Sequence, residues 1–240
     1  MKILELTLDD PIANIALDEA LLEEAELGQL GDEILRIWEP KSPIVVLGRS
    51  SEAKREANLE VCESRNIPVI RRCSGGAAIL TAPGCLMYAV VLSYDKRPEL
   101  RMLDAAHKFV ADNLQSALLS CRVPTNYIGT CDLAIGDKKV SGNSMRCKRD
   151  WMLYHGTLIC ENMDLDLIAS CLGMPKRQPD YRSGRGHREF LTRIPTTTAQ
   201  LAREVRSVWG PVEALTDWPI DKTSELVEQK YSRIDWNHRV

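Results

Sequence analysis

The chain has 240 residues, of which 44% are hydrophobic and 27% are charged, a balance typical of a globular domain with a sizeable core. Its net charge of −3 and its 5% content of aromatic residues disfavour a nucleic-acid-binding protein. No apolar stretch reaches the roughly 18 residues of a transmembrane helix, so neither nucleic acid nor membrane is an expected partner. The acidic start is unlike a signal peptide, and the eight cysteines include no CxxC pair. We therefore expect reduced thiols in the cytoplasm.

Hydrophobic periodicity and turn residues predict helices and strands along the whole chain. Asp10 followed by Pro11 is typical of a helix N-terminus, because the aspartate caps free N–H groups and proline lacks one. In chain order the expected elements are a strand at 2–7, a helix from 11 to about 27, strands at 33–38 and 44–47 joined by a turn at 40–43, a helix at 54–65, strands at 68–72 and 86–93, a helix at 103–118, a hairpin of 132–135 and 139–142, a strand at 154–160, a helix at 164–171, a loop at 174–188, and helices near 198–208 and 222–231.

The mixture of paired strands and helices favours an α/β or α+β fold with a mixed, largely antiparallel sheet flanked by helices. A doubly wound dinucleotide-binding fold is disfavoured because no GxGxxG motif follows the first strand. His107 lies on the apolar stripe of the helix at 103–118, so we expect it to pack in the core rather than to act chemically. The basic loop at 174–188 is either solvent-exposed or suited to docking an acidic partner.

The first candidate site is the run RRCSGGAA at 71–78, which ends a predicted strand. Glycines let a backbone approach a ligand closely, and successive N–H groups of such a turn form a nest for anions. Arginine adds a bidentate clamp for a carboxylate or a phosphate. A bare Ser-Gly-Gly turn is more often structural, but the paired arginines directly before it favour anion binding.

The second candidate site is the predicted hairpin at 132–142. Lys139 on the returning strand is followed by Ser141 and Gly142, and it is either a solvent-exposed lysine or a fixed positive charge in a cleft. Asp132 is either an ordinary strand residue or a ligand for Mg²⁺, which needs few protein carboxylates.

Short motifs follow one another in a specific order over roughly residues 10–195. They are NIALDE at 14–19, LRIW at 35–38, VVLGR at 45–49, RRCSGGAA at 71–78, GTCDLAIGDKKVSGNS at 129–144, YHGTLI at 154–159, and the residues at 181–182 and 190–192. Each motif is short, and His155-Gly156 alone would be mostly structural. Together they resemble the lipoate–protein ligase family, within the wider biotin/lipoate ligase and octanoyltransferase fold.

The resemblance implies a biotin/lipoate-ligase-like catalytic domain over residues 1–195, with 196–240 as a short helical C-terminal extension of the same domain. Such ligases use ATP and Mg²⁺ to convert lipoate or octanoate into an acyl-adenylate. They then transfer the acyl group to a lysine of a lipoyl carrier domain, as in E2 subunits or the glycine-cleavage H protein. No permanently bound cofactor is expected.

The resemblance also implies roles for individual residues. Lys139 would be the catalytic residue, because a fixed cation stabilises charge on the α-phosphate and the acyl carbonyl. Asp132 is the candidate Mg²⁺ ligand. The implied substrate- and nucleotide-binding residues are Arg72, Ser74, Gly75, Gly76, Ala77, Ala78, Ile79, Leu80, Ser141, Gly142 and His155.

Three features depart from the family pattern. Ala77 replaces the third glycine of the turn, and alanine resists positive φ. Leu80 is followed by Thr and Ala where ligases often have a Tyr/Phe-His-Asp stretch, and Pro83-Gly84 is more like the transferase branch. About fifty residues follow Phe190, too few for the accessory domain of full-length bacterial ligases, so a separate subunit is one expectation.

These departures keep two alternatives open. One is an ATP-independent octanoyltransferase that forms a cysteine thioester, which needs a thiolate near Lys139. The position used by one transferase branch holds Met152, so Cys131 or Cys147 would have to serve. The other is a non-catalytic protein that binds lipoyl domains. The ligase is favoured because no cysteine stands where a transferase branch has its nucleophile, and the retained Arg72, Ser-Gly-Gly turn and Lys139 disfavour the non-catalytic protein.

Overall fold

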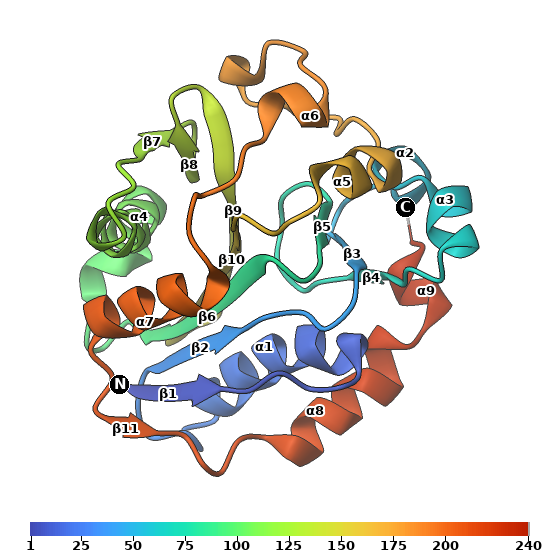
Figure 1. The fold of residues 1–240 in the computed structure, drawn as a ribbon. Coiled ribbons are helices and arrows are strands. Elements are labelled where there is room, and N and C mark those ends of the chain that lie inside the picture. The colour runs from blue at the N-terminus through green and yellow to red at the C-terminus, as the bar shows by residue number, and fades with distance from the viewer. Residues whose placement is uncertain (240) are drawn as a thin grey trace.

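A computed structural model describes residues 1–239 of the chain as a large sheet with helices on both faces and a small sheet beside it (Figure 1). The strands are β1 (Lys2–Glu5), β2 (Ile34–Trp38), β3 (Ile44–Leu47), β4 (Val69–Arg71), β5 (Ile79–Thr81), β6 (Cys85–Ser93), β7 (Asn126–Ile128), β8 (Asp132–Ile135), β9 (Lys138–Cys147), β10 (Trp151–Ile159) and β11 (Glu213–Ala214). The helices are α1 (Pro11–Glu26), α2 (Ala53–Glu56), α3 (Leu59–Ser64), α4 (Leu103–Ser120), α5 (Leu165–Cys171), α6 (His187–Phe190), α7 (Thr198–Trp209), α8 (Ile220–Leu226) and α9 (Ile234–Asn237).

The large sheet has the strand order β11-β1-β2-β6-β10-β9-β8-β7. Five of its neighbouring pairs are antiparallel, and only the pairs that involve β1 are parallel. The small sheet has the order β4-β3-β5. The mixed, largely antiparallel sheet that the sequence predicts is therefore confirmed.

Alternating side chains of the large sheet build a separate core on each face. On one face Tyr88 and Tyr154 pack with α4 and α7, and on the other Ala89 and Leu153 pack with α1. The small sheet forms a third core with α3 and α5. The small sheet lies to the side of the large one in Figure 1, and the candidate site lies where the two meet.

Three predicted elements are wrong in detail. The single helix expected at 54–65 is two helices, because Ala57 is extended and bridges Leu172, and Asn58 then caps α3 by accepting a hydrogen bond from the Val61 N–H. The strands at 33–38 and 44–47 are not partners across their turn but belong to different sheets. The loop at 174–188 contains a 3₁₀ turn at Asp180–Arg182 and the start of α6.

The chain after residue 195 continues over both sheets. The strand β11 pairs with β1, and α9 contacts β4 next to the first candidate site. The Arg71 guanidinium is fully buried and donates to the carbonyl oxygens of Trp236 at 3.0 Å, Asn237 at 3.0 Å and Arg239 at 2.7 Å. The C-terminal segment is thus attached to the strand that carries the arginine pair. Within residues 1–239 no helix combines the length and the apolar character needed to cross a membrane.

Candidate active site

A cavity of about 170 Å³ lies between the two sheets. Much of its wall is apolar. Its apolar lining residues include Ile15, Val46, Leu80, Met87, Ile159, Ile168, Leu172, Phe190 and Leu191. The wall also contains the sequence-predicted residues Arg72, Gly76, Ala77, Ala78, Ile79, Leu80, Lys139, Gly142 and His155.

Arg72 shapes the glycine turn from inside. Its guanidinium group donates to Ser74 Oγ at 3.1 Å, to the Ala77 carbonyl at 3.0 Å and to the Gly75 carbonyl. Burial lowers the pKa of Arg72 to about 10, which leaves it positively charged at neutral pH. Arg72 therefore holds the turn in place and adds positive charge directly beneath it.

Gly76 is the residue of the turn that needs to be glycine. Its φ is +84°, and a Cβ there would lie 2.9 Å from the Arg72 guanidinium. Ala77 has no positive φ, so the alanine at the third position does not strain the backbone as the sequence suggested. After the turn, the Ala78 N–H donates to Glu56 Oε2 at 2.7 Å, and Ile79 and Leu80 continue into β5 along the cavity.

Lys139 enters the cavity from β9 and is paired with Asp132. The Lys139 Nζ lies 2.7 Å from Asp132 Oδ1, and the Tyr181 hydroxyl donates to Asp132 Oδ2 at 2.7 Å. Burial raises the pKa of Tyr181, so its hydroxyl remains a hydrogen-bond donor. The lysine side chain is 23% exposed and is free to exchange Asp132 for an incoming anion.

The carboxylate of Asp132 does not fit a metal site formed by the protein alone. Both of its oxygens already have partners, Lys139 and Tyr181. In the chain up to residue 239, no cluster of three or more His, Cys, Asp and Glu side chains is placed to hold a metal ion. Asp132 is thus a partner of the lysine in this structure.

His155 lies on β10 and lines the cavity. Its Nδ1 lies 2.8 Å from Asp18 Oδ2, and its Nε2 lies 2.6 Å from Ser74 Oγ. Asp18 comes from α1 and also accepts from Arg36 Nη1 at 2.6 Å. Although burial opposes it, Arg36 and His155 together hold the pKa of Asp18 below its usual value.

The remaining predicted residues support the site without lining it. Ser74, Gly75, Ser141 and Asp132 are absent from the cavity wall, but each bonds or adjoins a residue in it. Ser141 is fully buried and donates to Asn143 Oδ1 at 3.2 Å. His107 is half-buried on the other face of the sheet, where its Nδ1 lies 3.0 Å from the Tyr154 hydroxyl.

The two candidate cysteines are poorly placed for nucleophilic attack. Cys131 is near Lys139, but burial, followed by the charge of Asp132, raises the pKa of its thiol to about 11. The thiol donates to the Asn143 carbonyl at 3.4 Å. Cys147 is exposed at the far end of β9, eight residues beyond Lys139 and so roughly 27 Å along the strand.

The basic loop is only partly exposed, contrary to the simplest expectation. Arg182 is buried and lines the cavity together with Arg177 and His187. Arg185 pairs with Asp137 at 2.7 Å and so ties the loop to the β8–β9 turn. Lys176 and Arg188 do face solvent, where they pair with Glu52 at 3.4 Å and with Asp166 at 2.7 Å.

Sequence reasoning missed the roles of several residues. Asp18, Glu56 and Arg177 lie far apart in the chain, yet all three line the cavity. Asp18 belongs to the quoted NIALDE motif, where a carboxylate on a buried helix face was a usable signal. Glu56 and Arg177 carried no such signal, because their positions depend on how α2 and the loop fold over the cavity.

The cavity thus brings apolar side chains together with a glycine turn and the cations of Arg72 and Lys139. The family model described as the lipoyl protein ligase A/B catalytic domain matches residues 10–206. The chain belongs to this family and is an enzyme of the lipoate–protein ligase class. The family resemblance of the motifs is confirmed.

Curated relatives of both reaction types are similar to the chain. Lipoate–protein ligase 1 of Staphylococcus aureus is 25% identical over 245 residues, covering 95% of this chain and 70% of its own. Octanoyltransferase LipM of Brevibacillus brevis is also 25% identical, over 266 residues, covering 95% of each chain. Identity alone therefore does not separate ligation from transfer.

Solved structures share the fold. A Thermoplasma acidophilum protein with bound lipoic acid superposes with a TM-score of 0.82 at 20% identity, covering 100% of this chain and 99% of that one. A structure of a bi-partite lipoate protein ligase and its E2 lipoyl domain from the same organism also gives 0.82, at 21% identity, covering 99% and 95%. A lipoate–protein ligase A bound with ATP gives 0.81 at 20% identity, covering 99% and 98%.

Proposed function

We propose that this chain is an ATP-dependent lipoate–protein ligase that activates lipoate or octanoate as an acyl-adenylate and transfers the acyl group to a lysine of a lipoyl domain. One observation carries the proposal. The turn residues Gly76 to Ala78, Arg72 and Lys139 line one cavity together with a set of apolar side chains. An acid whose tail packs against the apolar side chains would present its carboxylate to Arg72 and Lys139.

In the first step, the acid's carboxylate attacks the α-phosphate of ATP and pyrophosphate leaves. The N–H groups of the turn at 74–78 would bind phosphate oxygens, and Lys139 would stabilise charge that develops between the α-phosphate and the carboxylate. The catalytic effect would come from position and charge, with no covalent bond to the protein. Mg²⁺ would enter as part of the ATP substrate, held by phosphate oxygens.

The surroundings of the thiols support the ligase over the octanoyltransferase. A thioester mechanism needs a thiolate beside the lysine. Cys131 is protonated at neutral pH, and Cys147 is far from Lys139 along β9. Cys73, next to the glycine turn, is also a poor nucleophile, because burial raises the pKa of its thiol to about 12.

The acceptor would be a lipoyl domain, as for the bi-partite Thermoplasma acidophilum ligase, which was solved with its E2 lipoyl domain. By the same likeness, a separate accessory chain would complete the ligase activity. We also propose that the catalytic domain spans residues 1–195 and that 196–240 extends it. A cytoplasmic location remains a prediction from the sequence.

Isotope exchange between ATP and pyrophosphate tests the first step directly. We expect exchange that depends on both the protein and lipoate or octanoate. The same assay without acid is the control. Absence of exchange with either acid, by a protein that binds a lipoyl domain, would instead support the non-catalytic alternative.

A further inference from the structure

A positively charged side chain without a protein partner lies where the cavity meets solvent. Arg177 lines the cavity and is exposed, and within residues 1–239 its guanidinium group makes no hydrogen bond or ion pair. The other arginine and lysine side chains of the wall, Arg72, Lys139 and Arg182, are each bonded to another part of the protein. The charge of Arg177 is therefore available to a ligand.

The loop that carries Arg177 is attached to both sides of the cavity. Before the arginine, the Gly173 N–H donates to the Glu56 carbonyl of α2 at 3.0 Å. After it, the Tyr181 hydroxyl donates to Asp132 Oδ2 on β8 at 2.7 Å. The loop therefore passes over the cavity between α2 and β8.

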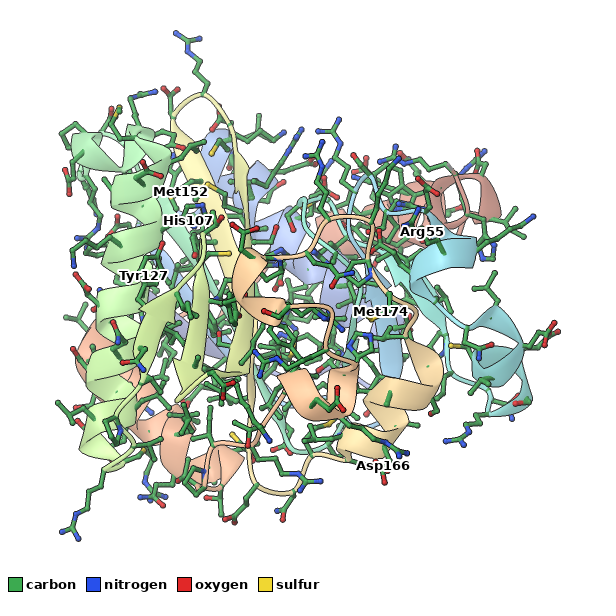
Figure 2. The ribbon with its side chains drawn as sticks, turned by 90° about the horizontal axis from the view of Figure 1, so that it is seen from above. Arg55, His107, Tyr127, Met152, Asp166 and Met174 are labelled. Carbon is green, nitrogen blue, oxygen red and sulfur yellow. The ribbon has the colours of Figure 1, made fainter. Side chains whose placement is uncertain are left out.

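Figure 2 shows the same crossing. Met174, at the start of the loop, lies between Tyr127 of β7 and Arg55 of α2 in this view. Pro175 and Pro179 stand on either side of the arginine in the chain and line the cavity, and each proline ring fixes φ at its position. The backbone around the arginine is thus restricted, which keeps its side chain at the opening of the cavity.

Formation of the adenylate releases a highly charged leaving group. A carboxylate oxygen of the acid forms a bond to the α-phosphorus of ATP, and the bond from that phosphorus to the bridging oxygen breaks with its electron pair. Negative charge therefore grows on pyrophosphate as it leaves, and a fixed cation beside it lowers the barrier. Pyrophosphate must also depart into solvent, so it lies toward the opening of the cavity. Arginine suits this group because its guanidinium binds two phosphate oxygens at once.

We propose that Arg177 binds the β- and γ-phosphates of ATP and stabilises the pyrophosphate leaving group, an inference that rests on the proposed ligase function. Lys139 and the glycine turn act at the α-phosphate and the carboxylate, and Arg177 acts at the other end of the triphosphate. Pyrophosphate has left before the acyl group reaches the lipoyl domain. Arg177 therefore contributes to adenylate formation and not to transfer.

The test measures the two half-reactions separately. Arg177→Ala is compared with the unaltered protein in pyrophosphate exchange, which reports adenylate formation, and in transfer from chemically prepared lipoyl-AMP to a lipoyl domain. We expect exchange to fall about 10-fold or more, with a higher KM for both ATP and pyrophosphate. Transfer should stay within about twofold, because the phosphates that Arg177 binds are absent from that step. Arg177→Lys should recover part of the exchange, because it restores the charge without the bidentate geometry.

Lys176→Ala is the matched control. Lys176 is the neighbouring cation of the same loop, but it pairs with Glu52 at 3.4 Å and lies outside the cavity wall. The substitution removes the same charge from the loop, so a general electrostatic attraction of ATP would be weakened in both variants. We expect Lys176→Ala to leave exchange and transfer unchanged. The thermal midpoint of each variant checks the fold, which substitution of exposed side chains should hardly affect.

Each outcome decides the matter. A loss of exchange alone, confined to Arg177→Ala and smaller in Arg177→Lys, supports the proposal. Unchanged exchange, an equal loss in Lys176→Ala, or a loss of transfer overturns it, and a loss of transfer alone assigns the loop to docking of the lipoyl domain. Absence of exchange in the unaltered protein overturns the ligase function and this inference with it.

Discussion

At the scale of single residues, the positive charge of Lys139 is central to the proposed chemistry. In this structure Asp132 balances it, and the Tyr181 hydroxyl holds Asp132 from the opposite side. An arriving carboxylate or phosphate therefore competes with one carboxylate for a lysine that is already oriented. The lysine loses little hydration in the exchange, because its partner was a protein anion.

Lys139→Ala should reduce adenylate formation by about 100-fold or more, because the developing charge loses its fixed cation. The fold should survive with some loss of stability, because the ion pair is mostly buried, with side chains 23% and 10% exposed, and its removal leaves Asp132 with Tyr181 as its partner. Activity and the thermal midpoint are measured together. Lys108→Ala is the control, because Lys108 forms an exposed pair with Asp112 within α4. Full activity of Lys139→Ala would contradict the site assignment.

Cys131→Ser and Cys147→Ser should each keep adenylate formation and transfer within about twofold of the unaltered protein, because neither thiol is placed to act and buried cysteine behaves as a small apolar residue. A steady-state assay with a lipoyl domain measures this. Loss of all transfer in one variant, with its fold intact, would identify a thioester intermediate and support the octanoyltransferase.

Arg72, Lys139 and His155, which line the cavity, could be predicted from the sequence, because each belongs to a recognisable motif of neighbouring residues. Their partners could not be predicted in the same way. Asp18 and Ser74 lie on either side of His155 because α1 packs against β10, a contact between segments more than a hundred residues apart. Tyr181 reaches Asp132 only through the fold of the loop.

At the scale of elements, the pairing of β9 with β10 positions Lys139 and His155 relative to one another. Asn143 of β9 lies opposite Gly156 of β10, and its side chain crosses over the glycine. There Asn143 Oδ1 accepts from Tyr88 at 2.5 Å, and its amide donates to the Cys131 carbonyl at 2.6 Å. The absence of a side chain at Gly156 makes room for this network.

Gly156→Ala should destabilise the fold by about 1–3 kcal/mol, because its Cβ would lie 2.1 Å from Asn143 Oδ1 and 2.7 Å from the Gly142 carbonyl. Urea unfolding measures the change. Adenylate formation should also fall, since Gly142 lines the cavity. Gly186→Ala is the control, because nothing lies within 4 Å of a Cβ there. Equal effects of the two substitutions would refute the packing argument.

The broken helix at 53–64 shows why elements remain hard to predict from local pattern. Most residues from Lys54 to Arg65 suit a helix, yet Ala57 is extended, where its backbone pairs with Leu172 after α5. That tertiary contact outweighs local propensity. The short strands β5, β7 and β11 were not predicted either, since two or three residues carry little periodicity.

At the scale of the whole molecule, the C-terminal segment stabilises the site from behind. Trp236 Nε1 donates to the Arg71 carbonyl at 2.8 Å, and the Trp236 ring packs between Lys230 and Arg239. The Arg71 guanidinium in turn bonds carbonyls of both the tail and the loop at 48–51. The tail and the loop at 48–51, which are far apart in the sequence, thus both contact Arg71, the residue directly before Arg72 (Figure 1).

Trp236→Ala should lower the free energy of unfolding by about 2 kcal/mol and raise the KM for ATP, because Arg71 and the adjoining turn lose their support. Trp209→Ala is the control, since Trp209 packs on Phe109 at the far face and touches no part of the turn. Both variants should lose stability, but only Trp236→Ala should change KM. An unchanged KM would show that the tail acts on stability alone.

Intact mass of a lipoyl domain shows whether the protein acylates it in an ATP-dependent reaction. One reaction holds the protein, a lipoyl domain, lipoate or octanoate, ATP and Mg²⁺, and the other replaces acid and ATP by octanoyl-acyl carrier protein. We expect the lipoyl domain to gain the acyl mass only in the first reaction. A gain only in the second would contradict it and establish an octanoyltransferase.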